Sequence, residues 1–305
     1  MGDLATATTV MRSVRTLLTG AIDYAGLFPP AGLPMAEAVL NYATYRNSNY
    51  SWMLGRFVVT AARLDEFYEN ARDFISRDAA NAWRVSVIVG EDTTETMHRL
   101  KDFNTRCGPG LVCDTVDINA DSHGAIENAV ASLPDDVTAY FELAAYENLA
   151  DLVATLALKG QRAKIRTGGV TPNAFPTARE IIRFVQTCLA ANVPFKATAG
   201  LHHPIRCFRP LTYEANAPEG TMHGFLNVFL MTGFAREGYK PSVLEEVMEE
   251  EFDEVFRFED RAVVWRDDFV LNLLQIERIR KFGIQSFGSC SFDEPVEDLQ
   301  KMGVL

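Results

Sequence analysis

Short apolar runs with the two-residue alternation of β-strands recur along the chain, and helical patterns lie between most of them. Eight runs read as strands, in chain order Gly20–Ala25, Arg56–Ala61, Arg84–Val89, Cys113–Ile118, Thr138–Leu143, Ala163–Thr167, Pro194–Thr198 and Ile284–Ser289. The helical segments include Leu64–Arg77, Thr94–Thr105, Ala125–Ser132, Leu149–Leu158 and Thr177–Ala191, the last opening with a capping box. This repeated strand–helix alternation predicts a closed (β/α)₈ barrel, a TIM barrel. An open doubly wound sheet is the alternative, but it would need a glycine-rich loop after the first strand, and Asp23 to Phe28 supplies none.

The regular spacing fails once, between the seventh and eighth predicted strands. The stretch Ile205–Phe282 holds apolar Gly224–Phe234, acidic Val243–Glu254, then Phe256–Trp265 and a predicted helix over Asp267–Lys281. We expect the acids to form one solvated helix face, because apolar residues recur beside them near helical spacing. The whole insertion, residues 205–282, is expected to be a small cap or an oligomer contact within one barrel domain of residues 1–305.

Charged side chains fall on the predicted inner face of consecutive strands. Small or apolar residues occupy one parity of each strand and suit the helix layer, so the alternate positions face the barrel interior. Five charged residues meet this test, namely Asp117, Glu142, Lys164, Arg166 and Lys196. Any one of them could be a strand-end charge paired at the surface. Five together indicate a functional interior, because an unpaired buried charge is strongly disfavoured.

The balance of these charges predicts the kind of ligand. Three cations against two anions leave a local positive charge, suited to an anionic or carbonyl-bearing molecule. A lysine with its ordinary pKa of about 10.4 is almost wholly protonated at neutral pH. We expect a neighbouring cation and poor solvation to lower the pKa, so that one amine becomes free to attack a carbonyl.

Six short motifs now resemble a known family in their order and spacing. KIRTG at residues 164–168 and FKATAG at residues 195–200 resemble the K-x-x-T-G and F-K-x-x-G-G strands of the deoxyribose-phosphate aldolases. IDYAGLFP at residues 22–29, DTVD at 114–117, FE at 141–142 and FGSCS at 287–291 resemble that family's other barrel motifs. The resemblance covers the chain from about Ile22 to Ser291. It implies a barrel that works through a lysine Schiff base.

The resemblance also assigns roles. Lys164 would be the nucleophile, Lys196 its pKa-lowering neighbour, Asp117 the proton shuttle and Asp23 a supporting acid in the first strand. The residues that we expect to contact the substrate are Glu142, Arg166, Thr167, Gly168, Thr198, Gly200, His202, Gly288 and Ser289.

Departures from the family pattern bear on the substrate. Gly169 stands where the family has a lysine that helps to hold phosphate, and Arg166 replaces a small hydroxyl residue. Ala199 replaces the first glycine after the second lysine, and the long insertion has no counterpart of its size. We therefore expect a substrate carboxylate bound by Arg166, because a planar guanidinium matches a carboxylate. An ion pair between Arg166 and Glu142 is the alternative.

Other candidate groups are weaker. His202 and His203 with Glu142 could hold a metal, but a loop or substrate-binding role is favoured, so we expect neither metal nor cofactor. Gly168 and Gly169 could offer backbone donors to an anion or form a plain loop. Cys290 as a nucleophile lacks a partner histidine nearby in the sequence, so a small packed residue is the better interpretation.

Composition narrows the setting of the protein. The net charge of −12 argues against nucleic acid as a partner. The five cysteines are scattered without a C-x-x-C pair, as in a reduced cytoplasmic protein; they are Cys107, Cys113, Cys188, Cys207 and Cys290. The longest apolar stretch, Gly224–Ala235, is too short to span a membrane, and Asp3, Arg12 and Arg15 do not fit a signal peptide. We expect a cytoplasmic protein with a small-molecule carbonyl substrate, and a homo-oligomer is the candidate assembly.

Three functions remain open at this point. The first is a lyase of the class I aldolase type, which makes or cleaves a carbon–carbon bond of a small, carboxylated oxo compound. The second uses the same Schiff base for the dehydration or decarboxylation of a keto acid. The third is a non-catalytic barrel that binds a small anion.

Overall fold

The computed structural model describes residues 10–144 and 148–305, so Asp3 and the start of the chain, on which the prediction about a signal peptide partly rests, lie outside it. Eight parallel strands close into a barrel in the order β1-β13-β7-β6-β5-β4-β3-β2, with β1 paired to β2. Their bounds are β1 Ile22–Tyr24, β2 Leu54–Thr60, β3 Trp83–Ile88, β4 Leu111–Asn119, β5 Thr138–Glu142, β6 Arg162–Arg166, β7 Phe195–Thr198 and β13 Ile284–Ser289. The predicted (β/α)₈ barrel is confirmed, and each predicted strand overlaps one of these.

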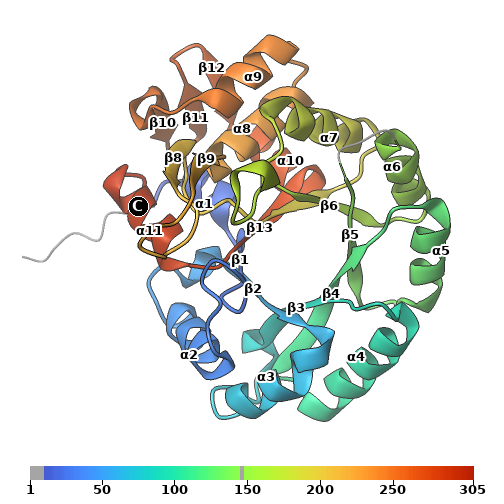
Figure 1. Cartoon of the computed structure of the whole chain (residues 1–305). Helices are drawn as coiled ribbons and strands as arrows, with labels where there is room; N and C mark the ends of the chain where they lie inside the picture. The colour runs from blue at the N-terminus through green and yellow to red at the C-terminus, as the bar shows by residue number, and fades with distance from the viewer. Residues whose placement is uncertain (1–9, 145–147) are drawn as a thin grey trace, which may run out of the picture.

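Helices surround the strands in a ring (Figure 1). They are α1 Arg12–Leu18, α2 Met35–Arg46, α3 Leu64–Ala71, α4 Thr93–Cys107, α5 His123–Ser132, α6 Leu149–Leu158, α7 Ala178–Ala190 and, after the last strand, α11 Asp293–Lys301. The capping box at Thr177 is confirmed, since Thr177 accepts from the Glu180 amide and Glu180 accepts from the Thr177 amide. The prediction that α3 runs on to Arg77 is wrong, because the helix ends at Ala71 and the chain beyond it has only exposed Phe74 and partly buried Ile75 as large apolar residues.

The chain between β7 and β13 forms two further sheets and three helices. They are the strands β8 Cys207–Pro210 and β9 Glu219–Met222, the helices α8 Phe225–Arg236 and α9 Pro241–Glu249, the strands β10 Phe256–Glu259, β11 Ala262–Trp265 and β12 Phe269–Asn272, and the helix α10 Leu273–Phe282. Figure 1 shows β10, β11 and β12 outside the ring of barrel strands. The role of this stretch as a cap or an oligomer contact stays a prediction.

Two details of that stretch differ from the sequence prediction. The predicted helix over Asp267–Lys281 is wrong in its first part, because β12 pairs with β11 and Asn272 caps the start of α10. Glu250 does not belong to a solvated face. It is buried, and its carboxylate accepts hydrogen bonds from Trp265 Nε1 at 3.2 Å and Arg266 Nε at 2.8 Å.

Helix α8 anchors this stretch to the barrel. Its apolar side chains are buried on all sides, and Phe225 stacks on Phe287 of β13 with ring centroids 4.7 Å apart. The one strongly polar residue in its middle, Asn227, is satisfied because its amide donates to the carbonyls of Val247 and Glu250 at 2.7 and 2.9 Å. In the described part of the chain, no helix is long and apolar enough to cross a membrane.

Candidate active site

Lys164 and Lys196 lie side by side at the centre of the barrel. β6 and β7 pair in parallel with Lys164 opposite Lys196, and β5 places Glu142 opposite Lys164 on its other side. The lysine side chains are 5% and 4% exposed, so both ammonium groups are removed from water. The inward parity predicted for these strands is confirmed.

Asp117 on β4 lies between the two lysines. Its Oδ2 is 3.1 Å from Lys164 Nζ, and its Oδ1 is 2.6 Å from Lys196 Nζ. Lys164 Nζ is also 2.9 Å from Glu142 Oε2. Lys196 Nζ donates to Ser86 Oγ at 3.2 Å. Each buried cation therefore has an anionic partner, which offsets the cost of removing it from water.

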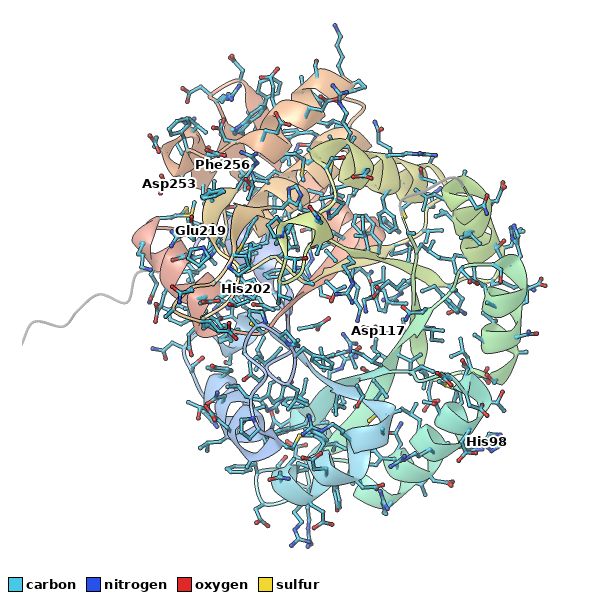
Figure 2. The ribbon with its side chains drawn as sticks, in the orientation of Figure 1. His98, Asp117, His202, Glu219, Asp253 and Phe256 are labelled. Carbon is cyan, nitrogen blue, oxygen red and sulfur yellow. The ribbon has the colours of Figure 1, made fainter. Side chains whose placement is uncertain are left out.

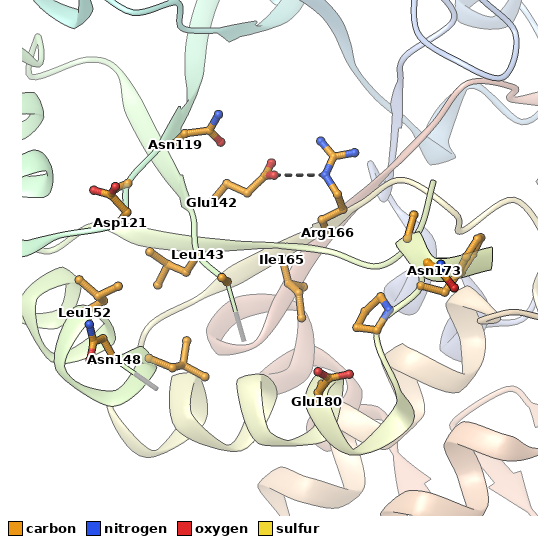
Figure 3. Close-up of a pocket in the computed structure, with 16 residues that line it drawn as sticks. Asn119, Asp121, Glu142, Leu143, Asn148, Leu152, Ile165, Arg166, Asn173 and Glu180 are labelled. Atoms are coloured by element: carbon orange, nitrogen blue, oxygen red, sulfur yellow. Dashed lines mark hydrogen bonds and ion pairs between the residues drawn. The ribbon is translucent and has the colours of Figure 1, made fainter. Parts of the chain in front are cut away.

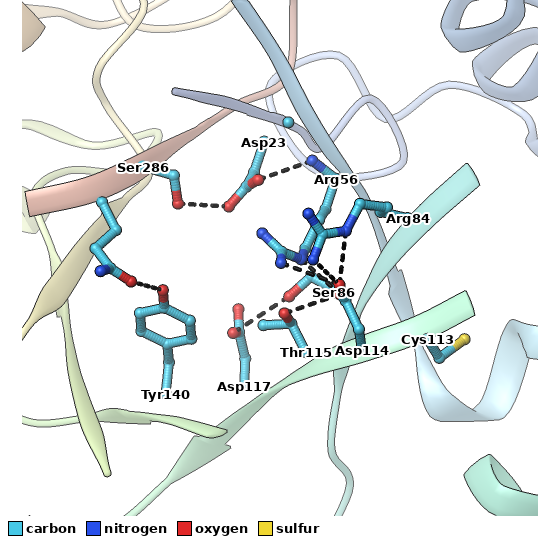
Figure 4. A network of polar contacts seen from close by, with 12 residues as sticks. Asp23, Arg56, Arg84, Ser86, Cys113, Asp114, Thr115, Asp117, Tyr140 and Ser286 are labelled. Atoms are coloured by element: carbon cyan, nitrogen blue, oxygen red, sulfur yellow. Dashed lines mark hydrogen bonds and ion pairs between the residues drawn. The ribbon is translucent and has the colours of Figure 1, made fainter. Parts of the chain in front are cut away.

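Asp23 on β1 completes the cluster from the other side. Its Oδ2 lies 3.8 Å from Lys196 Nζ and accepts a hydrogen bond from Ser286 Oγ at 2.7 Å, while its Oδ1 accepts from the Arg56 amide at 2.9 Å (Figure 4). Gly55 is required here, because a Cβ on it would stand 2.4 Å from Asp23 Oδ1. These contacts fix the Asp23 carboxylate where a supporting acid was predicted.

The charge balance corrects one expectation. With Asp23 included, three carboxylates face Lys164, Lys196 and Arg166, so the side chains of the cluster carry no excess positive charge. Burial alone would lower the pKa of Lys164, but the carboxylates of Asp117 and Glu142 outweigh it and raise that pKa above its usual value. The expected lowering of the Lys164 pKa is therefore wrong, because Asp117 and Glu142 lie within 3.1 Å of its ammonium, a closeness that strand parity alone does not give.

The ion pairs with Lys164 also shift the pKa values of Asp117 and Glu142. Burial alone would raise the pKa values of Asp117 and Glu142, but the Lys164 ammonium and the second cation beside each hold both values below their usual range. The lysine keeps its proton and both carboxylates stay ionised. Lys164, Asp117 and Glu142 are therefore held together as ion pairs.

Arg166 lies at the end of β6 and pairs with Glu142, as the alternative interpretation expected. Its Nε is 3.2 Å from Glu142 Oε1, and its side chain is 56% exposed (Figure 3). Among the residues that the structure describes, its two terminal nitrogens form no hydrogen bond. The pair with Glu142 uses Nε, so the edge formed by the two terminal nitrogens stays available to a carboxylate.

A cavity of about 380 Å³ opens onto these groups. Among its lining residues are Asp23, Asp117, Lys164, Arg166, Lys196 and His202. A larger hollow of about 990 Å³, lined by Glu142 among others, shares Arg166 with this cavity, but neither lysine lines that hollow. We place the candidate site in the smaller cavity because the buried ionisable groups are there.

The other predicted substrate contacts divide into residues that line the cavity beside the two lysines and residues that make contacts within the protein. Thr198 and Gly288 line this cavity. Thr167 is fully buried and donates its hydroxyl to the carbonyls of Thr198 and Ala199 at 3.2 and 2.7 Å. Gly168 and Gly200 pack against one another, because a Cβ on Gly168 would lie 2.8 Å from Gly200 Cα. The hydroxyl of buried Ser289 accepts from the Ser291 amide at 3.3 Å.

His202 and His203 point to different acids on α11. His202 Nδ1 is 3.2 Å from Glu294 Oε2, and His203 Nδ1 is 2.7 Å from Asp298 Oδ2. Within residues 10–144 and 148–305, no group of three or more histidine, cysteine or acidic side chains is arranged to hold a metal ion. The two histidines therefore serve separate contacts.

Folding also brings Cys290 beside His202, which lies 88 positions away in the sequence. Cys290 Sγ is 3.8 Å from His202 Nδ1, and the Tyr213 hydroxyl is 3.7 Å from the same sulfur. Burial alone would lower the pKa of His202, but its contacts with Cys290 and Glu294 raise it to about 9. Sequence reasoning missed this cluster, since no local motif joins its members.

Three further inward residues were missed although the same parity test indicates them. Ser86 alternates with Val85 and Val87, Tyr140 lies two positions before Glu142, and Ser286 lies two before Gly288. Ser86 and Ser286 hydrogen-bond the charged cluster, and the Tyr140 ring lies 4.6 Å from Lys196 Nζ. Because these three side chains are uncharged, a parity test applied to charged residues does not select them.

Fold and site together define a class, a (β/α)₈ barrel with a buried lysine pair, on a fold that commonly carries enzymes at the carboxyl ends of its strands. Compared with models of known protein families and with curated proteins, the sequence matches none.

Proposed function

We propose that this protein is a lyase of the class I aldolase type, which makes or cleaves a carbon–carbon bond of a small oxo compound through a Schiff base on Lys164. The observation that carries the proposal is the buried Lys164 ammonium in a cavity, held between Asp117 and Glu142 at 3.1 and 2.9 Å. The resemblance of residues 164–168 to the Schiff-base strand of the deoxyribose-phosphate aldolases supports the same residue.

The chemistry begins with a proton transfer. Lys164 passes a proton to a neighbouring carboxylate or to water, and the neutral amine then attacks the carbonyl carbon. Loss of water gives an iminium ion, which withdraws electrons from the adjacent bond. Cleavage of that carbon–carbon bond, or loss of an α-proton, leaves an enamine. Asp117, in contact with both lysines, is the group that we assign to relay the α-proton.

A carboxylate on the substrate is the second part of the proposal. The exposed edge of Arg166 offers two parallel donors, and such charge-assisted pairs contribute about 1.5–3 kcal/mol. Gly169 supplies no side-chain cation of the kind that would favour phosphate. A keto acid such as pyruvate is the simplest probe of this class.

Borohydride reduction in the presence of a carbonyl panel tests the proposal. Pyruvate, acetone and small aldehydes should add their reduced mass to the intact protein, and digestion should locate that mass on Lys164. Lys164→Arg should abolish trapping. The exposed Lys159, paired with Glu127 outside the barrel, gives a matched control, and Lys159→Arg should trap as the parent does. Trapping that survives in Lys164→Arg and vanishes in Lys196→Arg would reverse the roles of the two lysines.

The raised pKa of Lys164 favours one rival, a non-catalytic barrel in which the Lys164 ammonium helps to bind a small anion. Pyruvate binding seen by calorimetry without trapping by any carbonyl would support that function and refute the lyase. A Schiff-base dehydratase or decarboxylase would trap normally, and its product would be an unsaturated acid or carbon dioxide rather than a new aldol.

A further inference from the structure

The Asp117 carboxylate is committed to the two lysines, which leaves a second proton transfer without a catalyst. Its Oδ2 contacts Lys164 and its Oδ1 contacts Lys196. Forming an aldol bond requires removal of a proton from the α-carbon of the donor and delivery of a proton to the carbonyl oxygen of the acceptor. A second acid–base group beside the cavity would serve the acceptor oxygen while Asp117 stays with the lysines.

His202 is such a group. The ring lines the cavity with Lys164 and is 7% exposed, and it follows the end of β7, the strand that carries Lys196. Figure 2 labels His202 to the left of the barrel interior and Asp117 to its right. The two acid–base groups thus approach the cavity from different strands.

The contacts of the ring leave one nitrogen for the cavity. Cys290 and Glu294 both lie at Nδ1, at 3.8 and 3.2 Å. A carboxylate at Nδ1 holds a proton there and orients the imidazole. Nε2 forms no hydrogen bond within the described part of the chain. Two contacts on one nitrogen do not make a nucleophilic cysteine triad, in which the base uses both of its nitrogens.

We propose that His202 is the acid–base catalyst for the oxygen of the acceptor carbonyl, an inference that rests on the proposed function. As the enamine carbon bonds to the carbonyl carbon of an acceptor aldehyde, the C=O π electrons move to oxygen and Nε2–H gives that oxygen its proton. The product is a hydroxyl group and a neutral imidazole, which takes a new proton from water. In cleavage, Nε2 removes the hydroxyl proton as the carbon–carbon bond breaks. Glu294 and Cys290 act as positioning residues.

The charged and titratable groups around His202 favour the cationic form at neutral pH. Glu294 faces the ring from α11 and Cys290 from the end of β13, while Tyr213, from the loop after β8, contacts Cys290. Asp23 and Asp117, with the cations of the site, line the same cavity. With its pKa raised to about 9, the imidazole carries the proton that the acceptor oxygen needs.

The test separates the two proton transfers. Exchange of the α-protons of a donor such as pyruvate in D₂O needs the Schiff base and the enamine but no hydroxyl proton. Formation of an aldol with a panel of small aldehydes, glycolaldehyde among them, needs both. His202→Gln should keep borohydride trapping and α-exchange within about threefold of the parent and should lose aldol formation by about 10²–10⁴-fold.

His203 supplies the matched control. It also pairs with an acid of α11, and it does not line the cavity. His203→Gln should therefore leave trapping, exchange and aldol formation unchanged. If His202 merely ties its loop to α11, the His202 variant should lose exchange and aldol formation together.

Glu294→Gln adds a readout that a structural role would not move. Removing the carboxylate lowers the pKa of His202, so the alkaline fall in aldol formation should begin at a lower pH than in the parent. An unshifted fall, equal losses of exchange and aldol formation in His202→Gln, or a parent protein that exchanges but forms no aldol with any aldehyde would each overturn the inference. Absence of trapping by every carbonyl would instead refute the proposed function itself.

Discussion

Replacing Asp117 by Asn removes the carboxylate that two buried ammonium groups share. Breaking a buried ion pair by removing one partner costs about 3–5 kcal/mol, because the remaining charge is uncompensated. A lysine can limit that cost by losing its proton. At pH 7 this requires about 5 kcal/mol for a group with an unfolded pKa of about 10.4, at about 1.4 kcal/mol per pH unit. The two figures agree, so we expect Asp117→Asn to lower the free energy of unfolding by about 3–5 kcal/mol at pH 7.

The pH dependence of that loss identifies its cause. In the variant, Lys164 keeps Glu142 at 2.9 Å, but Lys196 keeps only the more distant Asp23 at 3.8 Å, so the protein should fold more readily with Lys196 neutral than with Lys196 charged. The destabilisation should therefore shrink by up to about 1.4 kcal/mol per pH unit as pH rises toward the ordinary lysine pKa of about 10.4. The deficit should therefore be clearly smaller at pH 9.5 than at pH 7.

Asp114, which lies three residues before Asp117 on β4, is the matched control. Its partners are arginines, with Arg56 Nε at 2.6 Å and Arg84 also in contact. Arginine keeps its charge throughout this pH range. The deficit of Asp114→Asn should not change between pH 7 and pH 9.5. Urea unfolding followed by the fluorescence of Trp83 and Trp265, both buried, measures all the variants. Equal pH dependence in the two variants would refute the assignment of two charged lysines to Asp117.

The same variant tests catalysis. If Asp117 relays the α-proton, Asp117→Asn should still form the borohydride adduct with pyruvate, while α-proton exchange in D₂O should slow by about 10²–10⁴-fold. Exchange at the parental rate in a variant that traps normally would remove Asp117 from the mechanism.

Three further outcomes follow from the contacts of the site. Arg166→Leu should weaken pyruvate trapping by about tenfold or more, equivalent to about 1.4 kcal/mol, and should spare acetone, whereas equal losses would mean that Arg166 only balances Glu142. Glu142→Gln should lower the pKa of Lys164, so the rise of trapping rate with pH should shift to lower pH in rapid-quench measurements. Because the pKa of His202 is raised to about 9, its stabilising contribution is complete below about pH 6.5 and is lost as pH rises through 9. The difference in unfolding free energy between the parent and His202→Gln should therefore shrink between pH 6 and pH 10.

Period-two alternation predicted the barrel and the inward direction of the lysines because both follow from strand geometry. In KIR at residues 164–166, one apolar position between two cations is enough to assign the faces. The neighbours of Lys164 could not be predicted, since register and shear decide which side chains meet across strands. The pKa of Lys164 was consequently predicted in the wrong direction, because its sign depends on distances to Asp117 and Glu142.

The contacts made by the loops after the strands could not be predicted from the sequence for a different reason. His202 and Cys290 meet because β7 and β13 are neighbours in the barrel, with Ala197 opposite Phe287. Neither residue lies in a regular element, so no periodicity fixes its direction. The apolar stretch at residues 224–234 is visible in the sequence, but its burial as α8 and its packing on Phe287 depend on the tertiary fold.

Glu142 holds Lys164 with one oxygen and Arg166 with the other, and this sharing makes the reactivity of the lysine conditional. An anion that docks on Arg166 takes over the guanidinium, and Glu142 then becomes a stronger base beside the ammonium it must deprotonate. A neutral carbonyl compound leaves the pair of Arg166 and Glu142 in place, so its adduct on Lys164 should form more slowly than that of a carboxylated compound. The arrangement would thus favour, among the carbonyl compounds of a cell, those that carry their own negative charge.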